Sequence, residues 1–97
     1  MKEDQIYEWI KLERRNQDHK WGEQNRTPLY WLGVLMEEVG EVAKALIEDK
    51  DPVYLNKAEY ELVQVAAVAI AFIDSLRRNE LKSETNRHMD VWNPKSP

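Results

Sequence analysis

Apolar side chains recur at helical spacing along three stretches of this chain. The first stretch is residues 4–18, where charged residues separate the apolar positions Ile6, Trp9, Ile10 and Leu12. This spacing predicts an amphipathic helix, and residues 21–26 interrupt it. Thr27 and Pro28 then give a start signal, because threonine is a favourable N-cap and proline suits the first helical position. The second helix is predicted to run from there to about Glu48.

The third stretch begins with a similar start signal at Asp51 and Pro52 and is predicted to be helical to about Arg78. At about 100° per residue, its apolar positions cover the whole circumference of the helix. One half carries Leu62, Val63, Ala66, Ala67, Ile70 and Ile73, and the other half carries Val65, Val68 and Phe72. A helix that is apolar on all sides is a buried helix.

Two further helices of one short chain can hardly surround such a helix. We therefore expect the same helix of a second subunit to cover it, with close approach at Ala66, Ala67, Ala69 and Ala71. The alternative is a tight three-helix core within one chain. Because short connections favour antiparallel neighbours, the predicted fold class is all-α. It is an antiparallel helical bundle completed by homo-oligomerisation, as a homodimer or a tetramer.

The length of 97 residues fits one domain. We assign residues 1–92 to this single helical domain, with a short fourth helix as an option at 81–92, and residues 93–97 to a flexible C-terminal tail. The chain has no cysteine, and a charged segment precedes the first predicted helix where a signal peptide would be apolar. A cytoplasmic location is therefore expected.

Charge and hydropathy argue against two classes of partner. The formal net charge of −4 disfavours nucleic acid, because proteins that bind it carry a basic surface. The longest apolar run, from Val65 to Ile73, is much shorter than the roughly 20 residues that span a membrane. We expect neither a nucleic-acid nor a membrane partner.

Glutamates are the candidate chemistry. Glu37, Glu38 and Glu41 are three or four residues apart on the second helix, which brings them to one face. Like charges so placed repel each other by a few tenths of a kcal/mol per pair, and a bound cation would reverse that sign. The third helix adds Glu61 and, one turn on, Gln64, on a face that is otherwise apolar.

If these two faces meet, the carboxylates converge with one amide beside them. Oxygen ligands select hard cations, so Mg²⁺ is the implied ion and Mn²⁺ the alternative. Such ions could clamp a polyphosphate. The competing interpretation is a solvated acidic helix face, because glutamate is a strong helix former. His19 and His88 are interpreted as surface residues, since no repeated Glu-x-x-His motif accompanies them.

A nucleotide would also need contacts for its base and phosphates. Trp21 lies in the interrupted segment beside Lys20 and Gly22. It is a candidate stacking platform, with a core plug as the alternative, whereas Trp9 and Trp31 fit core positions. Lys20 and Trp21 are the predicted substrate-binding residues. The basic residues that could pair with phosphate are Lys20, Arg26, Arg77, Arg78, Lys82 and Arg87.

The acidic pattern resembles that of the MazG-like all-α nucleotide pyrophosphohydrolases, in which Glu-Glu-x-x-Glu is followed by Glu-x-x-Asp. Here the two parts read Glu37-Glu38-Val39-Gly40-Glu41 and Glu61-Leu62-Val63-Gln64. The upstream segment Gln17-Asp18-His19-Lys20-Trp21-Gly22 is also similar to that of some members. The resemblance covers about residues 17–76.

This resemblance implies an oligomeric helical enzyme that cleaves nucleoside triphosphates between the α- and β-phosphates. It implies that Glu38, Glu41 and Glu61 bind Mg²⁺ and that Glu37 orients or deprotonates the attacking water. Where the family has its final aspartate, this chain has Gln64. We predict that the Gln64 amide oxygen is a metal ligand, and the alternative is that its N–H contacts the substrate. The alternative functions are a non-catalytic nucleotide-binding module and a helical dimerisation module.

Overall fold

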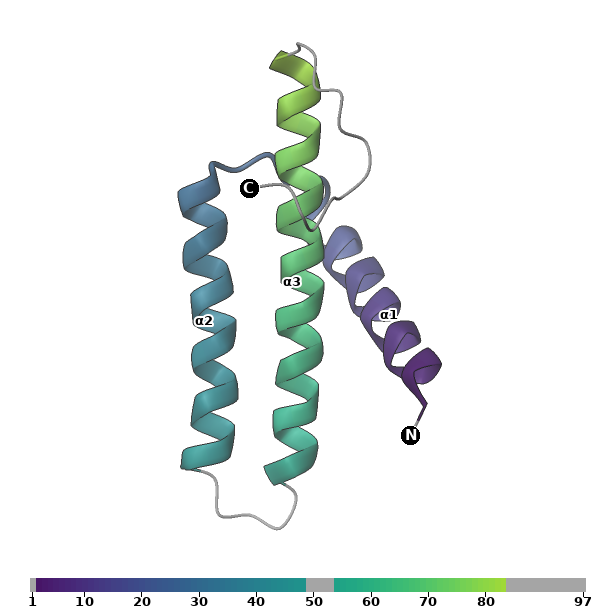
Figure 1. Cartoon of the computed structure of the whole chain (residues 1–97), viewed down its shortest axis with the longest axis vertical. Helices are drawn as coiled ribbons and strands as arrows, with labels where there is room; N and C mark the ends of the chain where they lie inside the picture. The colour runs from purple at the N-terminus through teal and green to yellow at the C-terminus, as the bar shows by residue number, and fades with distance from the viewer. Residues whose placement is uncertain (1, 49–53, 84–97) are drawn as a thin grey trace, which may run out of the picture.

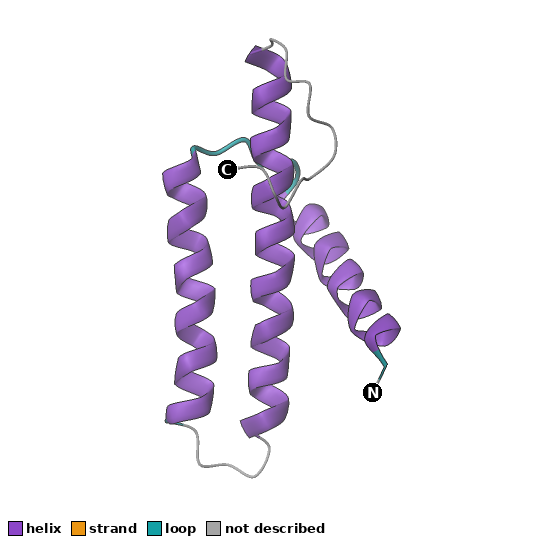
Figure 2. Cartoon of the chain, in the orientation of Figure 1, coloured by secondary structure: helices purple, strands orange, loops and turns teal. Residues whose placement is uncertain are grey.

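The computed structural model describes residues 2–48 and 54–83, and the regular structure in these ranges is entirely α-helical (Figure 1). Helix α1 is Glu3–Trp21, α2 is Pro28–Ile47 and α3 is Tyr54–Ser83. The described ranges contain no strand, as the colouring of Figure 2 makes plain. The all-α prediction is therefore confirmed for this part of the chain.

Helix α1 continues one turn beyond the end predicted from the apolar pattern. Acidic Glu3 and Asp4 occupy its first turn and basic Lys20 its last, which complements the helix dipole. The stop comes at Gly22, whose φ of 72° favours glycine and whose N–H donates to the Asp18 carbonyl at 2.8 Å. The prediction that residues 21–26 all lie outside the helix is thus wrong at Trp21, since the apolar stripe ended before the glycine signal did.

Helix α2 begins where the sequence indicates. The Thr27 hydroxyl oxygen accepts a hydrogen bond from the Tyr30 N–H at 3.2 Å, and Pro28 is the first helical residue. The helix ends at Ile47, and the Glu48 N–H donates to the Lys44 carbonyl at 2.9 Å. Both boundaries agree with the prediction to within one residue.

Helices α2 and α3 lie side by side and antiparallel, and α1 leans obliquely against α3 (Figure 1). The apolar core forms where α2 meets α3. It contains Trp31, Val68 and Ala71, with Val34, Leu35 and Phe72 packed around them. The Trp31 and Phe72 rings stack with centroids 6.0 Å apart, so the prediction of a core tryptophan at position 31 is confirmed.

Helix α3 is covered by its own chain on one side only. Ala67 is fully buried and Ala71 nearly so within the single chain, so neither is free to contact a second subunit. The expectation that these two alanines form a subunit contact is wrong, because apolar periodicity shows what is buried and not which helix buries it. Leu62, Ile70 and Ile73 remain exposed.

Several features predicted from the sequence involve residues outside the described ranges. The start signal at Asp51 and Pro52, most of the optional fourth helix at 81–92 and the tail at 93–97 lie outside the described residues, although 81–83 belong to α3. Among the described helices, none combines the length and the apolar character that crossing a membrane requires.

Candidate functional site

All three helices line one hollow, which we call the central hollow. Its volume is about 540 Å³. Four of the predicted site residues line it: Lys20, Trp21, Glu38 and Gln64. The rest of its wall is formed by Glu13, Asn16, Gln17, His19 and Tyr60. Residues up to 51 positions apart in the sequence, from Glu13 to Gln64, are thus gathered around one space.

Trp21 is accessible in the last turn of α1. Its side chain is 50% exposed, so the alternative of a core plug is wrong. The Lys20 ammonium lies 5.8 Å from the centroid of the Trp21 ring, within the range of a cation–π contact. An exposed indole beside a cation can receive a planar, negatively charged ligand.

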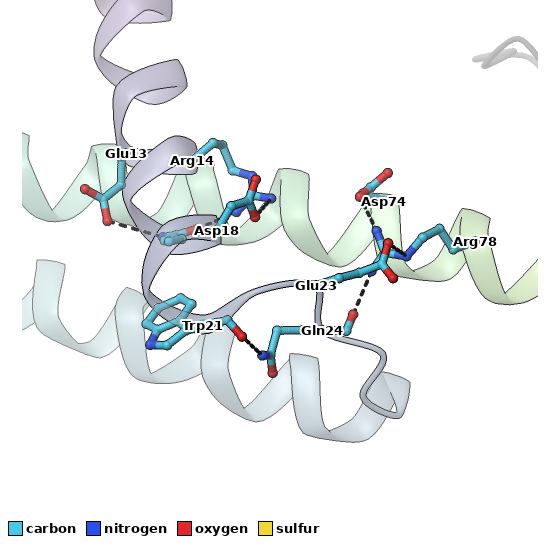
Figure 3. A network of polar contacts seen from close by, with 9 residues as sticks. Glu13, Arg14, Asp18, Trp21, Glu23, Gln24, Asp74 and Arg78 are labelled. Atoms are coloured by element: carbon cyan, nitrogen blue, oxygen red, sulfur yellow. Dashed lines mark hydrogen bonds and ion pairs between the residues drawn. The ribbon is translucent and has the colours of Figure 1, made fainter.

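A polar network fixes the chain that follows Trp21 (Figure 3). The Gln24 side-chain amide donates to the Trp21 carbonyl at 2.8 Å, and the Gln24 carbonyl accepts from Arg78 Nη2 at 2.7 Å. Arg78 also pairs with Glu23, at 3.3 Å, and with Asp74. The α1–α2 connection is therefore tied to α3, and Arg78, a candidate phosphate partner from the sequence, is engaged in holding it.

A second hollow of about 310 Å³ contains the other two predicted metal ligands, Glu41 and Glu61. We call it the acidic hollow, although two lysines share its wall with them. The wall is completed by Lys44, Ala45, Glu48 and Lys57. Lys57 was not predicted from the sequence, although it lies one turn before Glu61 and so could have been found from its spacing.

The acidic side chains of the two hollows repel one another electrostatically. Burial raises the pKa of Glu38, and the charges of neighbouring glutamates raise it further; in decreasing order these are Glu61, Glu41, Glu37 and Glu13. Burial and the Glu41 charge also raise the pKa of Glu61, while Lys57 opposes this shift. The predicted acids therefore act on one another electrostatically, as a shared cation site requires.

The arrangement stops short of a closed metal site. Within residues 2–48 and 54–83, no three acidic, histidine or cysteine side chains are grouped closely enough to hold an ion. The same repulsion that raises the pKa of Glu38 favours side-chain rotamers that keep carboxylates apart. The donor set fits a hard divalent cation in its chemistry, since it offers carboxylate oxygens from two helices.

Two predicted residues have contrasting surroundings. Glu37 is exposed to solvent on α2 and lines neither the central nor the acidic hollow. Gln64 is buried with 9% of its surface exposed, and its Nε2 atom has no hydrogen-bond partner among the described residues. Gln64 thus lies beside Glu38 in the central hollow, whereas Glu41 and Glu61 line the acidic hollow.

The sequence reasoning did not identify two polar residues of the central hollow, Asn16 and Tyr60. Tyr60 precedes Gln64 by one turn of α3, so helical spacing from the predicted ligand would have found it. Asn16 follows Leu12 by four residues and Trp9 by seven, so the apolar stripe of the first helix would have placed it on the face that turns toward α3.

Comparison with protein-family models, with curated proteins and with solved structures finds no match to this chain. What the protein does must therefore be inferred from the residues of the two hollows and from the acidic pattern of the sequence.

Proposed function

We propose that this chain is a Mg²⁺-dependent nucleoside triphosphate pyrophosphohydrolase, which releases a nucleoside monophosphate and pyrophosphate. The observation that carries the proposal is the central hollow, where Lys20, Trp21, Glu38 and Gln64 meet from three different helices. The MazG-like acidic pattern supports the same reaction.

Glu38, Glu41 and Glu61 would hold the ion, with Mn²⁺ as a substitute for Mg²⁺. Bound there, it would neutralise charge on the phosphoryl oxygens of the substrate and of the departing pyrophosphate. The electrostatic coupling among these glutamates supports their grouping. For Gln64 the sequence left two roles, metal ligand and substrate contact, and the unpartnered Nε2 atom favours the second.

Glu37 accepts the proton of the attacking water in this proposal, and Trp21 and Lys20 bind the substrate. Water attacks the α-phosphorus, its proton passes to the exposed Glu37 carboxylate, and the bond to the bridging oxygen of the pyrophosphate breaks. Trp21 stacks on the base and Lys20 pairs with phosphate oxygens. A cytoplasmic location, where nucleoside triphosphates are abundant, remains the expected setting.

The test is an assay of pyrophosphate and of single phosphate over a panel of natural and modified nucleoside triphosphates. We expect pyrophosphate release that depends on Mg²⁺ and stops when a chelator is added. Release of single phosphate would contradict the proposed cleavage position. Nucleotide binding without any release would favour the alternative of a non-catalytic binding module.

We also propose that a second copy of the chain completes the bundle. Helix α2 exposes an apolar stripe at successive spacings of four, three and seven residues, formed by Leu32, Met36, Val39 and Leu46. Helix α3 exposes a similar stripe that includes Leu62, Ile73 and Leu76. On each helix, the stripe is rotated about the helix axis by roughly a quarter turn from the residues that face the other helix. Viewed from the N-terminus of each helix, the rotation has the same direction in both. Because α2 and α3 are antiparallel, both stripes fall on one side of the pair.

Such a surface is typical of a four-helix contact between two hairpins. Sedimentation at micromolar concentration should therefore give at least twice the mass of one chain. Met36→Lys and Ile73→Lys should each shift the protein toward the monomer, because a lysine would be left unpaired in a dry contact. Tyr7→Lys, at an exposed position on α1, is the control and should leave the mass unchanged. A folded parent that sediments as a monomer would contradict this assembly.

A further inference from the structure

Gln64 is the buried polar group of the central hollow that the chain itself does not satisfy. Nine-tenths of its surface is buried, and Nε2 finds no acceptor among the described residues. A buried donor without a partner destabilises a fold, because it has lost its water and gained nothing in return. Such a group calls for an explanation, and a ligand is one.

A second buried glutamine shows what a structural amide looks like in this protein. Gln17 on α1 is 3% exposed and lines the same hollow. Its Oε1 accepts from Arg14 at 2.8 Å and its Nε2 donates to Glu13 at 3.5 Å. Two buried amides thus share one hollow, and the chain supplies partners to both ends of Gln17 but none to Gln64 Nε2.

The position of Gln64 separates it from the other predicted ligands. It lines the central hollow with Glu38, Lys20 and Trp21, and not the acidic hollow of Glu41 and Glu61. It also lines a neighbouring hollow of about 280 Å³ whose wall includes Trp9 and Tyr60. Gln64 therefore lies where aromatic side chains and the Lys20 cation surround the space that a nucleotide would occupy.

We propose that Gln64 recognises the nucleotide directly, with Nε2 donating a hydrogen bond to an oxygen of the bound substrate. This inference rests on the proposed function for the identity of the ligand. An amide N–H can donate to an oxygen that a carboxylate in the same place would repel. The substitution of glutamine for the acid of the MazG-like pattern then adds a substrate contact where that pattern has an acidic side chain.

The test measures nucleotide affinity in the absence of metal. Calorimetry in chelator with a nucleoside monophosphate, and separately with the matching nucleoside, compares the parent with Gln64→Met and Gln64→Glu. Gln64→Met keeps the shape and removes the donor, so we expect affinity about tenfold lower. Gln64→Glu should lose at least as much. Gln5→Met, an exposed amide on α1, is the control and should bind like the parent.

Two further measurements, the melting temperature and the Mg²⁺ affinity, distinguish the possible roles of Gln64. Without ligand, Gln64→Met should melt at a higher temperature than the parent, because the unpaired donor is gone. Titration of Mg²⁺ alone should be unchanged by Gln64→Met. A loss seen with both ligands assigns the oxygen to the base or sugar, and a loss confined to the monophosphate assigns it to the phosphate; both support the proposal.

Unchanged monophosphate affinity in Gln64→Met would overturn the proposal. So would a lower melting temperature, which would mean that the amide is already satisfied. Weakened Mg²⁺ binding with normal nucleotide binding would instead support the metal-ligand role of Gln64. A parent that binds no monophosphate in chelator would contradict a nucleotide as the partner of Gln64. Because these measurements need no turnover, their outcome is separate from that of the pyrophosphate assay.

Discussion

At the end of the bundle where α1 joins α2, the Arg78 guanidinium lies against the carboxylates of Glu23 and Asp74 and against a loop carbonyl. Burial raises the pKa of Glu38, and the charges of neighbouring glutamates, which have its own sign, raise it further. Both regions are polar and both join α3 to another part of the chain. One satisfies its charges internally and the other does not.

This difference separates a structural cluster from a candidate functional one. Pairing with opposite charge lowers the electrostatic energy of the folded chain, so the Arg78 network stabilises the fold without outside help. Crowded carboxylates raise that energy, and perturbed acids in a hollow are typical of sites that bind cations or transfer protons. The predictions below test whether the two clusters respond to substitution as this contrast requires.

The largest effect is expected from the acidic cluster. Glu61→Gln removes one negative charge from the acidic hollow and should reduce pyrophosphate release on the order of 100-fold or more, the size expected when an electrostatic contributor at a reacting centre is lost. Mg²⁺ affinity should fall with it. Glu3→Gln, an exposed acid in the first turn of α1, is the control and should retain activity. Full activity of Glu61→Gln would contradict the assignment of Glu61 to the metal site.

The Arg78 network should respond in stability. Arg78→Met removes the charged hydrogen bonds to the connection between α1 and α2 and should lower the free energy of unfolding by about 1–3 kcal/mol. Denaturant unfolding measures this directly. Lys11→Met breaks the exposed Lys11–Glu8 pair and should change stability by less than about 0.5 kcal/mol. Equal effects of the two substitutions would mean that the network is no stronger than a surface pair.

The smallest effect is a pH dependence at Glu38. Since its folded pKa is raised, the folded chain binds this proton more tightly than the unfolded chain. Stability from this group is therefore full below the ordinary glutamate pKa and is lost as pH rises through the raised value.

Metal-free Glu38→Gln should consequently have a free energy of unfolding a few tenths of a kcal/mol higher than that of the parent at pH 7. Denaturant unfolding measures this difference. The two proteins should converge below the ordinary pKa of 4.5. If Glu38→Gln instead lost stability at pH 7, the carboxylate would have a favourable partner and the contrast with Arg78 would fail.

How far the sequence predicted this molecule depended on how local each signal was. The start of α2 was predicted because Thr27 and Pro28 act on their own turn. Lys20, Trp21, Glu38 and Gln64 were predicted as site residues from the sequence. Neither their position around one hollow nor the division of the acids between two hollows could be derived from it, because both depend on how the helices are rotated. The roles of Ala67 and Arg78 were missed for a similar reason, since periodicity does not say which element contacts which.

Both other helices pack on α3, and the central hollow has walls from all three. This arrangement sets an order of assembly. The α2–α3 hairpin is local in sequence and should form early, whereas α1 packs on α3 alone among the described helices and should form and detach as a separate unit. Lys20 and Trp21 travel with α1, so each detachment would take the hollow apart while leaving the hairpin folded. The α1 amides should then exchange with solvent faster than those of α3, and a ligand that bridges the helices should slow that exchange.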